Sequence, residues 1–447
     1  MEIFAFIIDV LMKLGAPIVL PLVMTIIGLI FGMKFKDAIS AGLLFGVAFI
    51  GVGIVLTLLI DTITPAAEGF ANMTGKSLTI IDVGWPIASG ITWSWAYVLL
   101  MFPIVIGVNV VMLLLRWTKT LNVDIWNVWP IAFEAFLATY FTGHLWVGIV
   151  IAVIHAALDL LIADVMAKRA QKISGVPGVS CPHPMMSCAP PIFVIDWLLR
   201  KIPFFNTELD VETLRNKIGI FGENHILGLI LGFLISIIGG LDPFTSFAYG
   251  VVVGAAFYIL PMMAKIFMQA LAPISNKATE VMKKRFKDRE LYIGLDWPFM
   301  GGRSELWVVM IFTIPVTMLF ALIMPGNNVL PMASIVTISA VLVSLVVCNG
   351  NILRMYISSV VMIPLIFLLS NKIAPALTAL AASTGAYDFT AGQTITLWAQ
   401  ESVIFRYIFL TIIEGNYVMI AAAVLFIASV YFMIKGFNKA DAEEAKK

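Results

Sequence analysis

Long apolar runs separated by short polar segments follow one another through almost the whole chain. A helix that crosses a bilayer needs about 20 mostly apolar residues, and on that rule the pattern predicts about eleven transmembrane helices. They lie at residues 14–32, 40–60, 93–115, 129–147, 149–167, 224–241, 246–268, 305–324, 331–348, 352–370 and 416–434. The pattern therefore predicts an all-α polytopic membrane protein.

Two apolar stretches are too irregular to be simple spans. Residues 180–205 contain five prolines, and residues 375–412 combine turn-forming residues with an apolar run that Glu401 and Arg406 interrupt. Irregular backbone at membrane depth is tolerated only where protein or a water-filled cavity satisfies its polar groups. Both stretches are therefore expected to be re-entrant or interfacial hairpins.

The two halves of the chain resemble each other. Gly42, Gly46, Pro65, Trp85, Pro86, Trp95, Pro103 and Gly143 recur 207 to 212 positions later as Gly250, Gly254, Pro273, Trp297, Pro298, Trp307, Pro315 and Gly350. This predicts a first repeat at residues 1–215, a second at 216–415, and a last helix with a tail at 416–447. With five spans in each repeat, the second must be inverted, an arrangement that in transporters places the binding site between the repeats.

The charges of the loops agree with an inverted arrangement. Residues 277–290 are strongly basic, whereas the corresponding loop at 69–81 has Lys76 as its only base. Cytoplasmic loops of membrane proteins carry the excess of Lys and Arg. The basic loops therefore place the N-terminus outside and the C-terminus in the cytoplasm.

The composition supports a membrane protein and argues against several other classes. The chain is 61% hydrophobic and 12% charged, whereas soluble domains have about 25% charged residues. A net charge of +1 leaves no basic face for nucleic acid. Cys181, Cys188 and Cys348 cannot form a disulfide framework, and the spacing of the first two around His183 is not a standard zinc pattern. No phosphate-binding Gly-Lys-Ser/Thr loop is present, so neither a metal, a cofactor nor ATP-driven transport is expected.

The segment Tyr292–Glu305 is the strongest candidate for chemistry. It places Asp296 and Trp297 in a turn-rich break between a basic loop and an apolar run, and a weaker copy at residues 81–86 contains Asp82 and Trp85. Ionisable groups at membrane depth cost several kcal/mol unless they face a cavity or a partner. We therefore expect these residues to line a site between the repeats.

Two histidines and a glutamate coincide with similar breaks in regular structure. His144 follows a glycine between two spans, His183 lies in the proline-rich hairpin, and Glu401 lies in the second hairpin. An aromatic ring beside a carboxylate and histidines suits a polyhydroxylated ligand, because the ring stacks on C–H faces while the polar groups bond the hydroxyls. Gly51 and Gly53 allow close approach to the second span, although helix packing through small residues is the better explanation of both.

Three further ionisable residues have a structural explanation. His155 and Asp159 are four positions apart on one helix face, so they are expected to satisfy each other. Glu134 is expected to pair with a neighbouring helix.

Several motifs, in order along the chain, resemble those of one family. They are FIGVGI at 49–54, PAAEGF at 65–70, IDVGWP at 81–86, NVDIWN at 122–127, VIHAA at 153–157, the run at 243–268, IGLDWPF at 293–299 and PGNNVLP at 325–331. Over nearly its whole length the chain resembles the galactitol-type enzyme IIC. That is the membrane permease subunit of a phosphoenolpyruvate-dependent phosphotransferase system (PTS), and it is distantly related to the ascorbate permeases.

The resemblance implies more than the residues show by themselves. It implies a homodimer in which a core domain moves against a dimerising scaffold in an elevator-like motion. The substrate is then phosphorylated as it enters, by a phosphocysteine on a separate IIB subunit that IIA recharges, because this chain has no phosphorylated residue of its own. The basic loop 277–290 is the expected docking surface for IIB. The ligand contacts implied by the resemblance are Gly53 or Gly51, Trp85, His144, His183 and Asp296.

Two functions stay open at this point. The first is a permease subunit of the bacterial inner membrane that binds a polyol or sugar such as galactitol through Asp296 and Trp297, with His144 and His183 sharing its hydroxyls. Asp296 or His183 would accept the hydroxyl proton during phosphoryl transfer. The alternative is an ion-coupled secondary transporter of a small polar solute, in which Asp296 and Glu401 carry protons or sodium ions.

Overall fold

A computed structural model describes most of the chain. The described residues are 16–73, 78–122, 127–207, 220, 223–285, 290–301, 303–331, 334, 338–385, 387, 393–398 and 403–444. Glu401 and the loop residues 286–289 lie outside these ranges.

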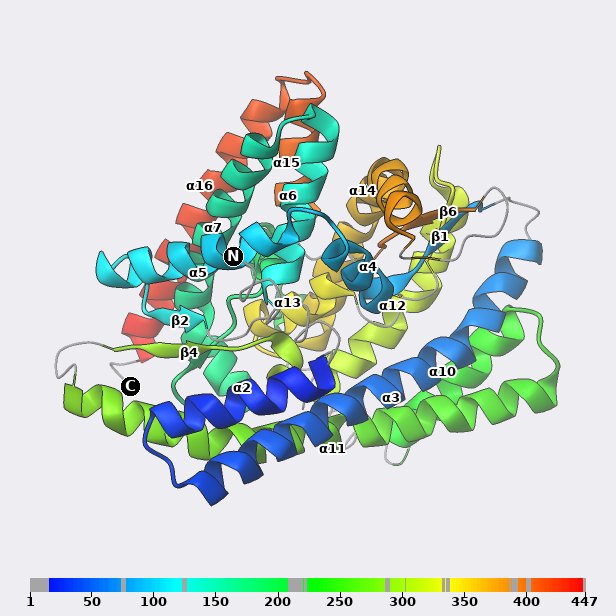
Figure 1. Cartoon of the computed structure of the whole chain (residues 1–447). Coiled ribbons are helices and arrows are strands. Elements are labelled where there is room, and N and C mark those ends of the chain that lie inside the picture. The colour runs from blue at the N-terminus through cyan, green and yellow to red at the C-terminus, as the bar shows by residue number, and fades with distance from the viewer. Residues whose placement is uncertain are drawn as a thin grey trace.

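The chain is mostly helical, with short strands between the helices (Figure 1). The first half contains α2 (Ala16–Ile30), α3 (Phe35–Met73), β1 (Ile80–Asp82), α4 (Gly84–Trp93), α5 (Val98–Leu114), β2 (Thr120–Asn122), α6 (Val128–Thr142), α7 (Leu145–Ser174), β3 (Val179–Ser180), the 3-10 helix η2 (Pro184–Cys188), α8 (Ala189–Leu199) and η3 (Pro203–Asn206). The second half contains α10 (Asn224–Ile238), α11 (Pro243–Arg285), β4 (Tyr292–Gly294), η5 (Trp297–Met300), α12 (Ser304–Ile323), β5 (Val329–Leu330), α13 (Ser339–Val347), α14 (Ile352–Thr384), β6 (Thr394–Thr396), α15 (Val403–Ile413) and α16 (Met419–Glu444).

Several of these helices are suited to cross a membrane. Among the described residues, five helices are long and apolar enough to do so: Phe35–Ala66 in α3, Leu145–Ser174, Ser304–Ile323, Ile352–Thr384 and Met419–Asp441 in α16. Helices α4 and α5, bent by 97°, make a sixth if they form one broken span. The expected multi-pass membrane fold is therefore confirmed, while the count of eleven spans stays a prediction.

The two irregular stretches differ in outcome. Residues 180–205 form η2, α8 and the start of η3, as short irregular pieces. The prediction that the second hairpin begins at 375 is wrong, because α14 continues through Pro364 and Pro375 as far as Thr384. A proline removes one helical hydrogen bond, but neighbouring elements can hold such a helix, and the residues on both sides of Pro375 are fully buried.

Helices α2, α3, α10 and α11 pack together along the lower edge of Figure 1. The α10–α11 contact is especially close because glycines oppose glycines. A Cβ on Gly228 would lie 2.8 Å from the Cα of Gly254, and one on Gly232 would lie 2.9 Å from the Cα of Gly250. Both helices thus present glycines four residues apart, a spacing that lets membrane helices approach closely.

The six strands of the described residues form two small parallel sheets. In each sheet, the central strand comes from one half of the chain and its two neighbours come from the other half. In sheet A, β1 of the first half lies between β5 and β6 of the second half; in sheet B, β4 of the second half lies between β2 and β3 of the first. The sheets lie on opposite sides of the molecule, sheet A on the right and sheet B on the left of Figure 1.

The hydrogen bonds around the two sheets correspond to each other. The N–H of Lys119, just before β2, donates to Asp164 Oδ2 on α7 at 2.9 Å. The N–H of Asn328, just before β5, donates to Asn371 Oδ1 on α14 at 3.1 Å. The order of elements from α2 to α8 is similar to that from α10 to α15, with the 3-10 helix η5 in the place of α4 and no counterpart of η2 among the described residues.

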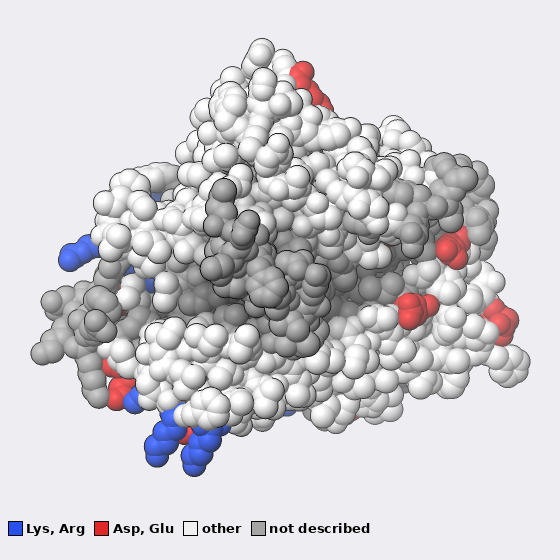
Figure 2. Space-filling view, in the orientation of Figure 1, with Lys and Arg blue, Asp and Glu red and all other residues white. Residues whose placement is uncertain are grey.

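Charged side chains are unevenly spread over the molecule. Lys and Arg gather toward the left of Figure 2, the side on which β4 and the C-terminal end of α11 lie in Figure 1, whereas Asp and Glu are visible on the left, at the top and on the right. The cationic side chains of this face are therefore found mainly on the side of sheet B.

Candidate functional site

The strands of sheet B bring together residues that are far apart in the sequence. Ser180 on β3 and Asn122 on β2 both pair with Gly294 on β4, and all three strands run parallel. The segments that leave their C-terminal ends therefore start at one edge of the sheet. Two of these segments carry predicted site residues, His183 after β3 and Asp296 after β4.

His183 and Asp296 face each other at this edge. His183 Nε2 lies 3.5 Å from Asp296 Oδ1, and both side chains are largely buried, with exposed fractions of 6% and 12%. His183 Nδ1 accepts the N–H of Met185 at 3.2 Å, and only a neutral imidazole can accept at this nitrogen. The ring proton therefore sits on Nε2, on the side of Asp296.

The backbone fixes the Asp296 carboxylate from the other side. The N–H of Trp297 donates to Asp296 Oδ1 at 2.7 Å. η5 follows at once and packs against α7 and α11, and Trp307 Nε1–H closes this turn by donating to the carbonyl of Gly301 at 2.8 Å. Trp297 is half-buried against the core. The same short segment therefore fixes the positions of both its ring and the Asp296 carboxylate.

Three asparagines extend the polar edge on the side of β2. Asn109 Oδ1 accepts the N–H of Asn122 at 3.0 Å, and Asn127 Nδ2 donates to Asn122 Oδ1 at 3.1 Å. The Asn127 side chain is buried, and its Oδ1 accepts no hydrogen bond from the described residues. The sequence pattern did not indicate these residues as site residues, although Asn122 and Asn127 belong to the motif at 122–127.

The same place in sheet A is closed by protein. Asp82 is buried, and its carboxylate accepts the N–H of Gly84 at 3.1 Å, of Ser334 at 2.7 Å and of Trp398 at 3.0 Å, besides the Ser334 hydroxyl at 2.9 Å. The two strands align so that Asp82 corresponds to Gly294 rather than to Asp296. Asp82 thus joins the strands of its own sheet, whereas sheet B has a glycine at that position and ends in Asp296 and His183.

The remaining predicted residues lie elsewhere. His144 is an exposed residue at the start of α7 and stacks on Trp146 with 6.5 Å between ring centroids. A Cβ on Gly51 would lie 2.3 Å from the sulfur of Met263 on α11, whereas one on Gly53 would meet no atom within 4 Å. Trp85 is half-buried beside sheet A. The structure therefore brings His183, Asp296 and Trp297 together but not these residues.

A second group of buried ionisable residues lies between α6, α7 and α15. Arg406 Nη2 and Nε lie 2.7 and 2.8 Å from Glu134 Oε1, and His155 Nε2 lies 3.4 Å from Asp159 Oδ1. Arg406 also lies over the ring of Phe133, 4.9 Å from its centroid. His155 and Asp159 lie beside each other as expected, but neither oxygen of Asp159 accepts a hydrogen bond from the described residues. Glu134 pairs with Arg406 of α15.

The second group lies near the edge of sheet B, because α7, which carries His155 and Asp159, packs against η2, which directly follows His183. The residues of this group come from positions 134 to 406, so no periodicity within one element could have indicated it.

The groups at the edge of sheet B are of the kinds that form hydrogen bonds with neutral hydroxyl groups. It offers acceptors on Asp296 and Asn127, a donor on His183 Nε2 and the partly exposed ring of Trp297, which is the set of groups that a polyhydroxylated ligand needs. Among the described residues, no group of three or more His, Cys, Asp or Glu side chains could hold a metal ion.

The sequence is similar to known membrane permease components. Residues 10–392 match the family described as "PTS system sugar-specific permease component". The galactitol-specific EIIC components of the PTS of Escherichia coli strain K12 and of Escherichia coli O157:H7 are each 34% identical over 388 residues, which cover 86% of this chain and 85% of theirs. A further protein of strain K12, whose name proposes a permease IIC component, is 35% identical over 395 residues, covering 88% of this chain and 90% of its own.

Proposed function

Because the chain belongs to the family of sugar-specific permease components of the PTS, we propose that it binds a polyol or sugar at the edge of sheet B and delivers it for phosphorylation. Membership implies a sugar substrate and cooperation with IIB and IIA components. The observation that carries the proposed site is the buried approach of His183 Nε2 to Asp296 Oδ1 at 3.5 Å.

Each group at the edge has a role in this proposal. Asp296 accepts a substrate hydroxyl, His183 donates from Nε2 to an adjacent oxygen, Asn127 Oδ1 accepts a second hydroxyl, and the Trp297 ring covers C–H groups. The 3.5 Å separation of His183 and Asp296 is long for a hydrogen bond. A substrate oxygen that binds between His183 and Asp296 therefore has to displace only a weak contact between these two side chains.

Asp296 is the group we assign as proton acceptor. In the tautomer that the structure holds, the His183 nitrogen nearest to Asp296 carries a proton and cannot take another. As the substrate oxygen bonds to the phosphorus of the IIB phosphocysteine, the S–P bond breaks, and the hydroxyl proton passes to the Asp296 carboxylate. His183 keeps its proton and orients the oxygen.

The other predicted residues have different roles in the proposal. Asp82 acts through the backbone that it holds, because protein donors already occupy its carboxylate. Trp85, His144, Gly51, Gly53 and Glu401 stay predicted contacts, which another arrangement of the two halves would have to bring to sheet B.

We propose two inverted repeats within residues 1–215 and 216–415. The recurring element order, the exchanged strands and the corresponding hydrogen bonds of Lys119 and Asn328 support them. A homodimer with elevator-like movement, and a bacterial inner-membrane location with the N-terminus outside and the C-terminus in the cytoplasm, complete the proposal. The basic side seen in Figure 2 supports this orientation.

Galactitol is the first substrate to test, because two relatives are named for it. The experiment is calorimetric titration of the purified full chain with galactitol, other hexitols and sugars. Asp296→Asn and Trp297→Ala are expected to weaken binding by about tenfold or more, while the exposed control Asp242→Asn leaves it unchanged. Wild-type affinity in both site variants would refute the site.

Transport distinguishes the proposal from ion coupling. With IIA, IIB and phosphoenolpyruvate inside vesicles, the substrate is expected to accumulate in phosphorylated form. Accumulation of unmodified substrate driven by a proton or sodium gradient alone would contradict the proposed function.

A further inference from the structure

A large cavity lies away from sheet A, among the ends of several helices. Its volume is about 920 Å³. We call it the basic cavity; it is lined by Lys168, Arg169 and Lys172 of α7, by Phe193, Asp196, Trp197 and Arg200 in and just after α8, by Val347 and Asn349, and by residues 432, 435–437 and 439–441 of α16. None of these residues belongs to the edge of sheet B.

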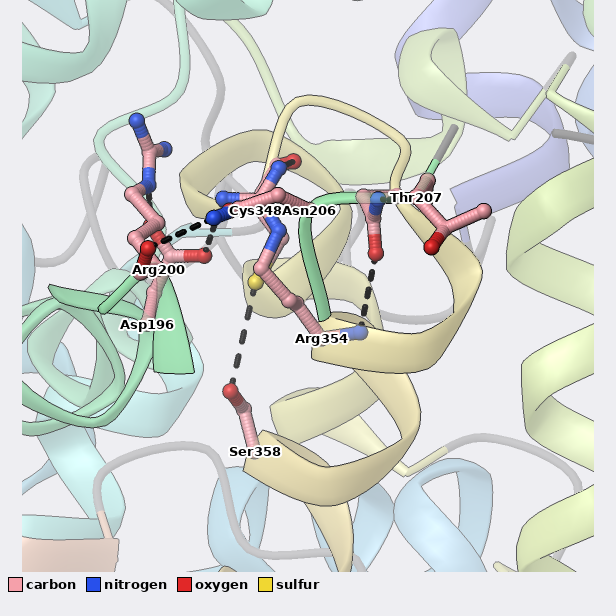
Figure 3. A network of polar contacts seen from close by, with 8 residues as sticks. Asp196, Arg200, Asn206, Thr207, Cys348, Arg354 and Ser358 are labelled. Carbon is pink, nitrogen blue, oxygen red and sulfur yellow. Dashed lines mark hydrogen bonds and ion pairs between the residues drawn. The ribbon is translucent and has the colours of Figure 1, made fainter. Parts of the chain in front are cut away.

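Positive charge dominates the lining. Six cationic side chains face two carboxylates, and each carboxylate already holds two cations. Arg200 Nε and Arg354 Nη1 donate to Asp196 at 2.6 and 2.9 Å, as Figure 3 shows. Asp441 lies 3.3 Å from Lys168 and 3.0 Å from Arg169. An anion entering the cavity would therefore meet an excess of positive charge.

The floor of the cavity is fixed by the protein itself. Asp196 is fully buried, and its partner Arg354 also donates to the carbonyl of Cys348 at 3.2 Å. Asn351 Nδ2 donates to the carbonyl of Thr207 at 2.9 Å, which ties the end of η3 to the start of α14 (Figure 3). Asp196, which lines the cavity, is therefore held in place by Arg200 and Arg354.

The cavity lies where two apolar helices end. Lys168 and Lys172 are four residues apart near the end of the Leu145–Ser174 span, and Lys435 and Lys439 are four residues apart near the end of the Met419–Asp441 span. Residues at this spacing share a helix face. The cavity therefore lies at the level where a bilayer passes from hydrocarbon to headgroups.

Apolar and aromatic side chains connect the cavity to the outer surface. Trp197 packs edge-on against Phe432 at 5.3 Å between ring centroids and is 40% exposed. On α16, the residues before the cavity are strongly exposed and apolar, among them Leu425 and Ile427. Tryptophan is typical of the membrane interface, and the exposed aliphatic side chains suit contact with acyl chains.

We propose that the basic cavity binds the phosphodiester headgroup of an anionic phospholipid. Basic pockets between helices on the cytoplasmic side are suited to such headgroups. A free phosphate ester offers the same charge, but the exposed apolar face of α16 beside the cavity favours a phospholipid, because its acyl chains can lie along that face. This site goes beyond the proposed transport function and uses none of its residues.

The test is native mass spectrometry of the full chain with phosphatidylglycerol, using phosphatidylethanolamine as the neutral lipid. A Lys435→Ala/Lys439→Ala variant is expected to weaken phosphatidylglycerol binding about fivefold per lysine. The matched control is Lys34→Ala/Lys36→Ala, which removes two exposed lysines outside the cavity and is expected to leave lipid affinity unchanged. A second cavity variant, Lys172→Ala, guards against a folding defect in the first.

Three outcomes would overturn the proposal. The first is equal loss of lipid in the cavity and control variants. The second is binding of inorganic phosphate or a hexitol phosphate at the cavity in preference to phosphatidylglycerol. The third is weaker binding of the IIB partner in the cavity variants with unchanged lipid affinity.

Discussion

The N–H of Trp398 donates to Asp82 Oδ1 at 3.0 Å, across 316 positions of the chain. Together with Ser334, this bond fastens β1 of the first half to segments of the second half. Asp82 had been predicted as a contact of the substrate, but its oxygens hold the protein together.

Asp82→Asn is therefore expected to affect stability first. The amide replaces one acceptor oxygen by a donor that faces backbone N–H groups, and each buried group left unsatisfied costs about 1–3 kcal/mol. Thermal unfolding in detergent should occur at lower temperature, while the folded fraction keeps its affinity for galactitol. Lost affinity at unchanged stability would instead make Asp82 a direct ligand.

Gly294→Ala is expected to disturb the candidate site without adding a polar group. A Cβ there would lie 2.7 Å from Pro182 Cγ and 2.9 Å from Thr120 Cγ2, so β2 and β3 must move away from β4. His183 follows Pro182 directly, and galactitol affinity should fall. Gly107→Ala is the matched control, because its added Cβ also meets no atom within 4 Å and Gly107 is not a predicted ligand contact. Equal loss of affinity in both variants would show that the close packing around Gly294 does not determine binding.

Arg406→Met is expected to destabilise the protein strongly. The substitution leaves Glu134 buried without its cation, and breaking a buried ion pair costs about 3–5 kcal/mol. Chemical unfolding in detergent measures the effect. The double variant Glu134→Leu/Arg406→Met removes both charges and should recover much of the loss. If it is as unstable as the single variant, the pair does not act as a unit.

Asn127→Ala tests the part of the site that the sequence analysis missed. Removing the Oδ1 acceptor should weaken galactitol binding by about tenfold, measured by calorimetry. Asn327 is the matched control, since its Oδ1 accepts the N–H of Val329 and its Nδ2 donates to the carbonyl of Ala321. Asn327→Ala should lower stability and leave affinity unchanged. If Asn327→Ala weakens binding and Asn127→Ala does not, Asn127 is not part of the site.

The sequence predicted the apolar helices well because a membrane span needs a long continuous apolar run. It also indicated His183 and Asp296, since proline and glycine mark the breaks that hold them. Strands of only two or three residues are too short to show the alternating pattern of a strand. The sheet that brings the side chains of His183 and Asp296 together could therefore not be predicted. The extent of α14 was missed because proline is normally a helix boundary in water, whereas here α14 continues past the exposed Pro375, whose neighbours Ala374 and Ala376 are buried.

Partners across long separations were equally hidden. Glu134 was expected to find a partner on another helix, yet Arg406 could not be named, because nothing near either residue encodes the approach of α6 to α15. The acid in both breaks suggested that Asp82 corresponds to Asp296. The offset of 212 between Trp85 and Trp297 instead pairs Asp82 with Gly294, and the ends of β1 and β4 agree with that pairing.

The exchange of strands between the sheets also constrains biosynthesis. When a ribosome has released β1, the neighbours of that strand at 329–330 and 394–396 have not yet been made. The newly inserted N-terminal portion must therefore wait in the bilayer with its strand edges unpaired. A chain truncated between the two halves would lack β4, β5 and β6, and neither sheet could be completed.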